Sequence, residues 1–247
     1  IDITGDLFAN GSGFSFSDPG GSIGGNVILG GGATTTGAAI GSLITVGGNV
    51  DIDRESVLGG NWAISGNLTN SGRIAPGNPI GRISVDGDLT LLPGSILDME
   101  IDSDDADVIE VGNMAVLDGS VQVTPLARAL IDTPYPVVNA AGGISGTFSQ
   151  GVTFAESLPF VEATLSYEPT TAFVTFGRND VPFASVAGTS NQHRVAEALD
   201  EIASPDPLVS AITFTSERGA RQAFDHLSGG IHASTMAALV EGSDHLR

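Results

Sequence analysis

Two serine-containing segments have residue types that are used in catalysis. Gly20-Gly21-Ser22-Ile23-Gly24 matches G-x-S-x-G, the nucleophile elbow in which a Ser attacks a carbonyl group from a strained strand-to-helix turn. The residues after Gly24 have a strand pattern and further glycine instead of a helix pattern. We therefore interpret this segment as a turn.

A second candidate lies near the C-terminal end, where Asp225, His226 and Ser228 supply the residue types of a hydrolase triad. Neighbours on one helix point to different sides, so these three cannot form an ordered Ser–His–Asp hydrogen-bond chain. His226 and His232 are six residues apart, whereas a helical zinc pair needs a spacing of four. We interpret His232 as a polar helix residue.

Carboxylates that could hold a hard cation such as Ca²⁺ gather at Asp102, Asp104, Asp105 and Asp107. The segment has no glycine-bearing loop of the EF-hand type and no closing Glu at the twelfth position. The pattern therefore favours a solvated turn, with Asp107 as a turn-capping acceptor before a strand at Val108.

Cleavage of a polysaccharide would need carboxylates with basic help on one exposed face. Arg54, Arg73 and Arg82 are scattered, and the carboxylates show no evident register from coil to coil. We therefore expect that the chain is not an enzyme and that it has no catalytic, cofactor or metal site.

Composition excludes several further classes. The net charge is −20, and the nine basic residues are all Arg. Binding to nucleic acid is excluded because phosphate neutralisation needs a basic surface. The chain has no Cys, so disulfides, thiolate zinc sites and Cys nucleophiles are absent. No run approaches eighteen apolar residues, and no leader precedes Ile1, so we expect a fragment of a longer precursor.

A repeat organises the first half of the chain. Gly, then Asn or Asp, then an aliphatic residue recurs at Gly5-Asp6-Leu7, Gly25-Asn26-Val27, Gly48-Asn49-Val50, Gly66-Asn67-Leu68, Gly87-Asp88-Leu89 and Gly112-Asn113-Met114. Short alternating runs of strand period follow these turns. A unit of about twenty residues cannot bury its own apolar face, so units must stack. The sequence therefore predicts a parallel β-helix.

The C-terminal half adds two further expectations. An apolar cluster, which we expect to cap the stacked core, comprises Phe154, Leu158, Phe160, Leu165, Tyr167, Phe173 and Phe176. After Pro182 the pattern becomes helical. We predict one helix with the stripe Val195, Ala198, Leu199 and Ile202, capped by Ser190 or Asn191, and a second helical region over residues 216–246.

Four blocks resemble the C-terminal passenger region of monomeric bacterial autotransporters, the type V secretion family. Residues 70–81 resemble the recurring N-S-G-x-I-A-P-G-N-S-I-G, with Pro79 in place of Ser. Residues 135–148 resemble the Y-x-I-x-x-A-G-G-x-x-G-x-F strand pair, and residues 179–192 resemble N-D-V-x-F-A-x-x-A followed by N-Q. Residues 227–234 resemble L-S-G-E-I/V-H-A-S, with Gly230 in place of Glu.

The resemblance implies a right-handed β-helix and export to the cell surface of a Gram-negative bacterium, outside the outer membrane. It implies three parts: β-helix coils over residues 1–70, an autochaperone-like cap over 71–178, and an α-helical linker over 179–247. The linker would lead into the protein's own β-barrel translocator, which this sequence lacks. His232 would then contact the inside of the pore.

These expectations favour a membrane-proximal stalk that supports export and templated folding of the passenger. Two alternatives remain. One is an adhesin or self-association surface that binds a host or neighbouring-cell ligand. The other is a stalk that displays an upstream enzyme domain.

Overall fold

The computed structural model describes residues 2–11, 13–15, 20–36, 42–77, 79–126, 129–203 and 206–229. The chain forms two compact units, Ile1–Ala155 with Ala163–Phe176, and Glu156–Glu162 with Gly177–Arg247. No helix in the described ranges is both long and apolar enough to cross a membrane.

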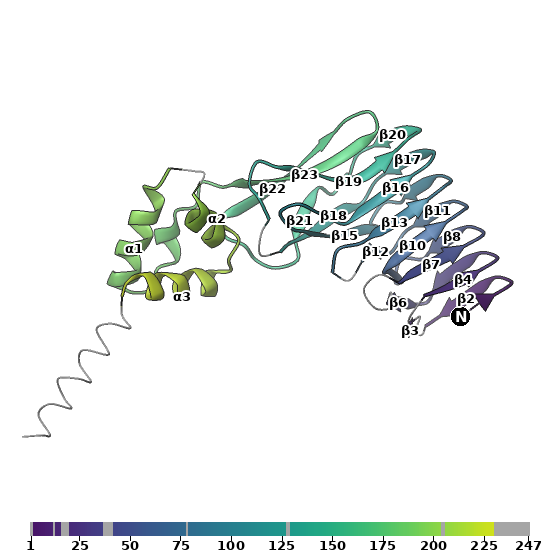
Figure 1. The fold of residues 1–247 in the computed structure, drawn as a ribbon, viewed down its shortest axis with the longest axis horizontal. Coiled ribbons are helices and arrows are strands. Elements are labelled where there is room, and N and C mark those ends of the chain that lie inside the picture. The colour runs from purple at the N-terminus through teal and green to yellow at the C-terminus, as the bar shows by residue number, and fades with distance from the viewer. Residues whose placement is uncertain are drawn as a thin grey trace, which may run out of the picture. The chain divides into compact units, whose positions relative to one another are not determined.

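The first unit is a parallel β-helix, in which each coil contributes one strand to each of three sheets (Figure 1). Equivalent strands of successive coils pair in parallel. The predicted fold class, mainly β with a parallel β-helix and a C-terminal α-helical segment, is confirmed.

The strands of sheet A that pair in parallel are β1 (Asp2–Ile3), β4 (Gly20–Ile23), β7 (Leu43–Val46), β10 (Asn61–Ile64), β13 (Arg82–Val85), β16 (Val108–Val111) and β19 (Pro134–Ala140). Sheet B consists of β2 (Leu7–Asn10), β5 (Val27–Gly30), β8 (Val50–Ile52), β11 (Leu68–Asn70), β14 (Leu89–Leu91), β17 (Met114–Leu117) and β20 (Gly143–Gly146). Sheet C consists of β3 (Gly13–Ser15), β6 (Thr34–Thr36), β9 (Val57–Gly59), β12 (Arg73–Ala75), β15 (Ile96–Ile101), β18 (Ser120–Pro125) and β21 (Val152–Phe154).

Apolar side chains from the three sheets stack in columns inside the coil. In sheet A, Ile44 lies opposite Trp62, which lies opposite Ile83 in the next coil. All three side chains are at most 1% exposed, and the Trp62 indole donates to the Gly59 carbonyl at 2.9 Å. Stacking on the neighbouring coils completes the burial of each coil's inward face, as the repeat length predicts.

An antiparallel hairpin ends the parallel coil. Strand β23 (Thr171–Arg178) pairs antiparallel with β19, with a register shift between Pro136 and Val138. Strand β22 (Val161–Tyr167) follows β23 at the margin of sheet A. The hairpin therefore occupies the edge on which another parallel strand would otherwise pair.

The predicted apolar cap is only partly correct, because its residues divide between the two units. Within the β-helix, the Phe176 ring lies 6.1 Å from that of Phe154 and 6.0 Å from that of Tyr135. Phe160 instead belongs to the second unit, where its ring lies 4.8 Å from that of Phe183.

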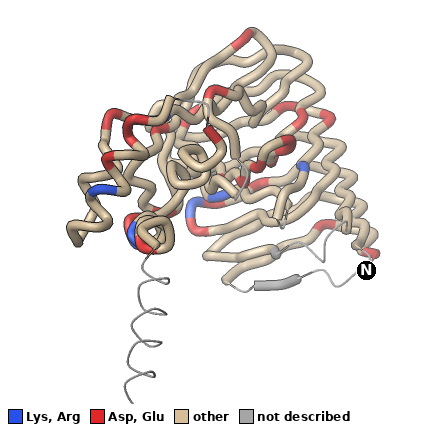
Figure 2. The backbone as a smooth tube through the Cα atoms, turned by 60° about the vertical axis from the view of Figure 1, so that its left-hand side comes forward, with Lys and Arg blue, Asp and Glu red and all other residues tan. Residues whose placement is uncertain are grey.

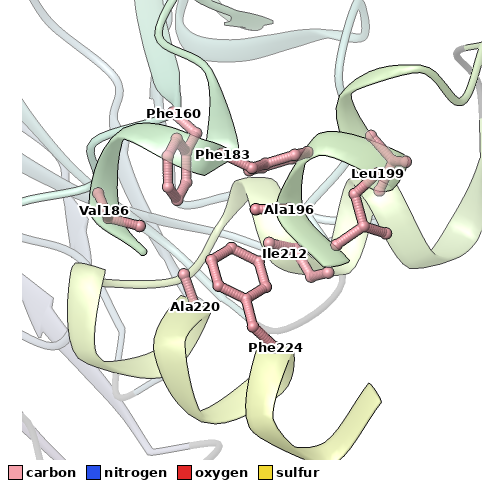
Figure 3. Close-up of a cluster of buried hydrophobic side chains, with 9 residues drawn as sticks. Phe160, Phe183, Val186, Ala196, Leu199, Ile212, Ala220 and Phe224 are labelled. Atoms are coloured by element: carbon pink, nitrogen blue, oxygen red, sulfur yellow. The ribbon is translucent and has the colours of Figure 1, made fainter. Parts of the chain in front are cut away.

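The second unit contains a 3₁₀ helix, η1 (Phe183–Val186), and three α-helices, α1 (Ser190–Asp200), α2 (Pro207–Thr213) and α3 (Glu217–Leu227), within the described residues. Thr189, Asp206 and Ser216 cap the α-helices by accepting backbone N–H groups. Figure 3 shows the core that these helices share: Phe160, Phe183, Val186, Ala196, Leu199, Val209, Ile212, Ala220 and Phe224.

Several helix predictions need correction. The cap of α1 is Thr189, and its buried residues are Gln192, Ala196 and Leu199, whereas Ala198 and Ile202 are exposed. Helix α2 was not predicted. The predicted second helical region, 216–246, is confirmed over α3 (Glu217–Leu227), and its part from residue 230 onward lies outside the described residues.

Candidate functional site: the ladder between coils

The nucleophile-elbow pattern lies in a strand. Ser22 is in β4, opposite Asp2 of the preceding coil, and its hydroxyl donates to the Asp2 carboxylate at 2.7 Å. The next element along the chain is the strand β5, so the strained strand-to-helix turn is missing. Ser22 therefore links two coils.

The triad-like residues at the end of α3 do not form a catalytic chain. The Asp225 carboxylate accepts from the Gln192 side-chain amide at 2.9 Å, and the Ser228 hydroxyl donates to the Asp225 carbonyl at 2.8 Å. His226 is exposed. These bonds hold α3 against α1 and close its C-terminal turn. His232 lies outside the described residues.

The aspartate-rich segment contains one buried member. Asp107 is 1% exposed, and its carboxylate accepts from the backbone N–H groups of Gly81 and Glu100, both at 2.7 Å. Burial raises the pKa of Asp107 to about 8. Asp107 does accept hydrogen bonds directly before β16, as predicted, but it is buried, so the expectation of a solvated turn is wrong for this residue.

Asp102, Asp104 and Asp105 remain in the turn before Asp107. The Asp102 N–H donates to the Asp105 carbonyl at 2.9 Å, which closes the turn. Across the described ranges, no three His, Cys, Asp or Glu side chains are grouped so that they could hold a metal ion.

Two of the three scattered arginines form hydrogen bonds to the next coil. Arg73 in β12 donates to Asp98 in β15 and, at 2.8 Å, to Gln122 in β18. Arg82 in β13 donates to Glu110 in β16 at 2.8 Å. The backbone trace in Figure 2 shows that Asp and Glu far outnumber Arg. Each of these two arginines pairs with one carboxylate of the following coil.

The principal finding is a ladder of Asn and Asp side chains at the turn that enters sheet B. We call Asp6, Asn26, Asn49, Asn67 and Asp88 the Asx ladder. Each side-chain oxygen accepts the backbone N–H one coil further on: Asp6 from Asn26 at 2.7 Å, and at 2.8 Å Asn26 from Asn49, Asn49 from Asn67 and Asn67 from Asp88.

The glycine that precedes each Asx makes room for this bond. A Cβ atom on Gly25, Gly48, Gly66 or Gly87 would lie 2.2–2.5 Å from the Asx oxygen of the preceding coil, which is closer than atoms can approach. Each Gly-Asx pair therefore contacts two neighbouring coils. The Asx side chain bonds to the next coil, and the glycine leaves space for the Asx oxygen of the preceding coil. We call the space beside each of these glycines the Asx socket.

The sixth repeat is out of register. The Asp88 carboxylate accepts from Met114 N–H at 3.1 Å, and Asn113 N–H donates to Gly87 O at 3.2 Å. Asn113 therefore occupies the place of a ladder glycine, and Met114 occupies the place of an Asx. The Asx ladder stops at this coil.

The first family-like block has a physical explanation. The buried Asn70 accepts from Gly72 N–H at 2.9 Å, and Ser71 donates to the Ile52 carbonyl of the preceding coil at 3.0 Å. A Cβ on Gly72 would lie 2.1 Å from the Asp53 carbonyl oxygen. Asn70-Ser71-Gly72 thus forms a corner of the coil that other residues would not fit.

Sequence reasoning missed the polar residues that organise the helical unit. Gln192 is 6% exposed and accepts from Gly188 N–H at 2.8 Å, while Arg221 donates to the Val186 carbonyl at 2.6 Å. The first contact holds the loop between η1 and α1, and the second holds the end of η1 against α3. A polar residue on a helix is normally expected to be exposed. The only sequence signal for Gln192 was its place in the family-like block over residues 179–192.

The fold and the ladder together define a β-helical stacking module. No family model matches the chain. It is 26% identical over 257 residues to an extracellular serine protease of Serratia marcescens, in an alignment that covers 82% of this chain and 24% of that protein. A second extracellular serine protease of Serratia marcescens is 24% identical over 294 residues, covering 88% and 28%. The chain thus spans about a quarter of the length of these relatives.

Proposed function

We propose that this chain is the membrane-proximal stalk of an autotransporter passenger and that it supports export and templated folding of the passenger. Three observations support the proposal. The blocks over residues 70–81, 135–148 and 179–192 resemble that region of autotransporters. The similar Serratia proteins are named as extracellular. The β-helix is also built to stack in one direction.

The observation that carries the proposal is that the coil is closed at one end of sheet A. There, the antiparallel strands β23 and β22 follow β19. This hairpin pairs with the edge of β19 and so blocks the addition of a parallel strand. The parallel stack can therefore grow in only one direction, from residues 71–178 toward the coils that precede them in the chain.

In this proposal residues 71–178 fold first outside the cell and template the coils that emerge after them. Each added coil buries apolar surface against the last one, and this burial opposes return through the pore. Residues 179–247 lead into the protein's own translocator in the outer membrane. The stalk itself has no enzymatic role and sits on the extracellular side.

Deletion of residues 71–178 tests this role in cells that express the chain with its native flanking residues. We expect export to fall and the exposed passenger to become sensitive to protease. The matched control removes residues 48–65, a single coil between the equivalent glycines Gly48 and Gly66, which leaves every later register intact. A passenger that folds normally without residues 71–178 would disprove the templating role.

A second candidate is display of an enzyme domain, favoured by the protease names of the similar proteins and the quarter of their length that this chain spans. The chain would then hold a protease domain of a longer protein away from the membrane. A fluorophosphonate probe, which labels active serine hydrolases, distinguishes display from catalysis. We expect no labelling of this chain; labelling that Ser22→Ala abolishes would make the chain itself the hydrolase.

A further inference from the structure

We propose that a groove on the outer face of sheet C is a docking surface for a Lys or Arg side chain carried by a basic segment of a partner protein. The groove has a volume of about 360 Å³ and is lined by residues of five successive coils. The proposal goes beyond the export role above and does not depend on it.

The shape of the groove follows from the lengths of the side chains that project from sheet C. In β15 and β18 alternate residues face outward, and Glu100 lies opposite Thr124 on this face. In the two preceding coils the groove is lined by Gly59 of β9 and Ala75 of β12, which lie opposite each other. The outer face of the sheet therefore steps down from long polar side chains to nearly bare backbone, and this step forms the groove.

One carboxylate in the groove has no cation to balance it. The Asp98 carboxylate pairs with Arg73, and the buried Asp107 carboxylate accepts two backbone N–H groups. The partly buried Glu100 carboxylate forms no ion pair or hydrogen bond with any described residue. Burial, and then the charge of Asp98, raise the pKa of Glu100. An unpaired charge that is partly removed from water is stabilised by an opposite charge, so the groove favours a cationic ligand.

The rest of the lining favours a cationic side chain over a metal ion. A divalent cation such as Ca²⁺ needs several oxygen ligands, and no three His, Cys, Asp or Glu side chains of the described residues are grouped to hold one. The ammonium group of Lys or the guanidinium group of Arg can pair with a single carboxylate. The aliphatic stem of such a side chain fits the apolar part of the lining, which consists of Val57, Ala75 and Pro76.

The charge of the protein indicates where this side chain comes from. The chain contains no Lys and has a net charge of −20, so two copies of it repel each other. The same charge attracts a basic segment from a distance and speeds its association. The occupant is therefore a basic segment of a different protein.

Peptide titration of the complete chain tests the proposal. The probes are acetylated and amidated pentapeptides, Gly-Ser-X-Ser-Gly, in which X is Lys, Arg or norleucine. Norleucine keeps the aliphatic stem of Lys and lacks the ammonium group. Binding is followed by NMR at the indole N–H of Trp62, the single Trp of the chain, which donates at 2.9 Å to the carbonyl of the groove residue Gly59. Calcium chloride is titrated in a separate sample.

We expect the Lys and Arg peptides to shift the Trp62 signal in a saturable way, and the norleucine peptide and calcium chloride to leave it unchanged. Glu100→Gln should weaken binding of the Lys peptide by roughly fivefold, because it removes the unpaired charge. Glu162→Gln is the matched control, since it changes the net charge equally at an exposed position of β22 and should leave the affinity unchanged. Ala75→Leu should weaken binding without removing a charge, because the larger side chain fills the groove.

Three results would each overturn the proposal: no saturable shift with either basic peptide, equally tight binding of the norleucine and Lys peptides, or equal effects of Glu100→Gln and Glu162→Gln. A saturable shift with calcium chloride that Glu100→Gln abolishes would make the groove a metal site instead. Urea unfolding followed by Trp62 fluorescence verifies that each variant is folded before its affinity is compared.

Discussion

The Arg178 guanidinium group and the Asp200 carboxylate form an ion pair at 3.0 Å within the helical unit, with the guanidinium carbon 3.9 Å from the centre of the Phe183 ring. The same carboxylate accepts from the backbone N–H groups of Phe183 at 2.9 Å and Ala184 at 3.3 Å. One aspartate at the end of α1 thus holds the start of η1 and orients a cation over an aromatic ring.

Asp200→Ala should destabilise the helical unit by about 1–3 kcal/mol, because it leaves two N–H groups and a guanidinium group without their acceptor. Amide exchange in α1 and α3 should quicken, while Trp62 fluorescence, which reports the β-helix, should keep its unfolding midpoint. Glu197→Ala on the exposed side of α1 is the control. Equal effects of the two changes would contradict the role of Asp200.

Gly66→Ala should destabilise the β-helix by about 1–3 kcal/mol. The new Cβ would meet the Asn49 side-chain oxygen at 2.4 Å and the Gly48 carbonyl oxygen at 2.6 Å, and the latter belongs to the backbone and cannot turn away. Urea unfolding followed by the single buried Trp62 measures the change.

Gly5→Ala is the matched control for the glycine prediction, since open space surrounds the position of its Cβ. Its free energy of unfolding should stay within about 0.5 kcal/mol of that of the parent chain. A comparable loss from both substitutions would show that backbone freedom, and not the Asx contact, requires glycine at these turns.

The stability of the β-helix should fall as pH rises between about 4 and 8. The pKa of Asp107 is about 8 in the folded chain, against an ordinary value of 3.8, so the folded state binds the proton more tightly than the unfolded state. The contribution of Asp107 is complete below pH 4 and is lost as pH rises toward 8, with a slope of at most about 1.4 kcal/mol per pH unit.

Urea unfolding of the parent chain and Asp107→Asn at pH 5, 6.5 and 8 checks this dependence. The Asn side chain loses one acceptor, so the variant starts less stable, but its stability should vary less with pH. Glu100→Gln is measured alongside, because burial and then the charge of Asp98 raise the pKa of Glu100 and add to the same slope. Parallel pH curves for parent and Asp107→Asn would refute the assignment.

Arg73→Met should cost about 0.5–1 kcal/mol in low salt and less in 1 M NaCl, because the Arg73 pair with Asp98 is partly exposed and is screened. Arg54→Met is the control, since Arg54 is exposed and forms no ion pair with any described residue. Trp62-monitored urea unfolding at both salt concentrations provides the comparison. A salt-independent loss would point to packing of the Arg73 stem instead of its charge.

The parallel coil could be predicted from the sequence because its signal is repeated and local. A turn such as Gly48-Asn49 followed by alternating residues specifies a strand, and the recurrence of such turns specifies stacking. The one-residue displacement at Asn113 could not be read in this way. Register depends on which backbone groups pair. In the sequence, Gly112-Asn113-Met114 looks like one more regular copy of the motif, so the displacement is not visible there.

The helical unit was less accessible to sequence reasoning. Helix α2 has seven residues, too few for an apolar stripe to repeat, although Asp206 followed by Pro207 is a readable start signal. The hydrogen bonds of Gln192 and Asp200 arise only when η1 packs beside α1. The residue pattern of a single helix does not show which other segment its polar side chains will contact.

The displacement at Met114 divides the β-helix into two kinds of coil. From Asp6 to Asp88, every boundary between coils in the Asx ladder uses the same contact, an Asx side chain in an Asx socket. A whole coil could therefore be duplicated or removed there without changing the contacts at the junction. At the junction between Asp88 and Met114 the bonds are displaced by one residue, so a copy of an upstream coil would not reproduce them there. We therefore expect the β-helix to tolerate the gain or loss of a whole coil before Asp88 and not at the junction with Met114.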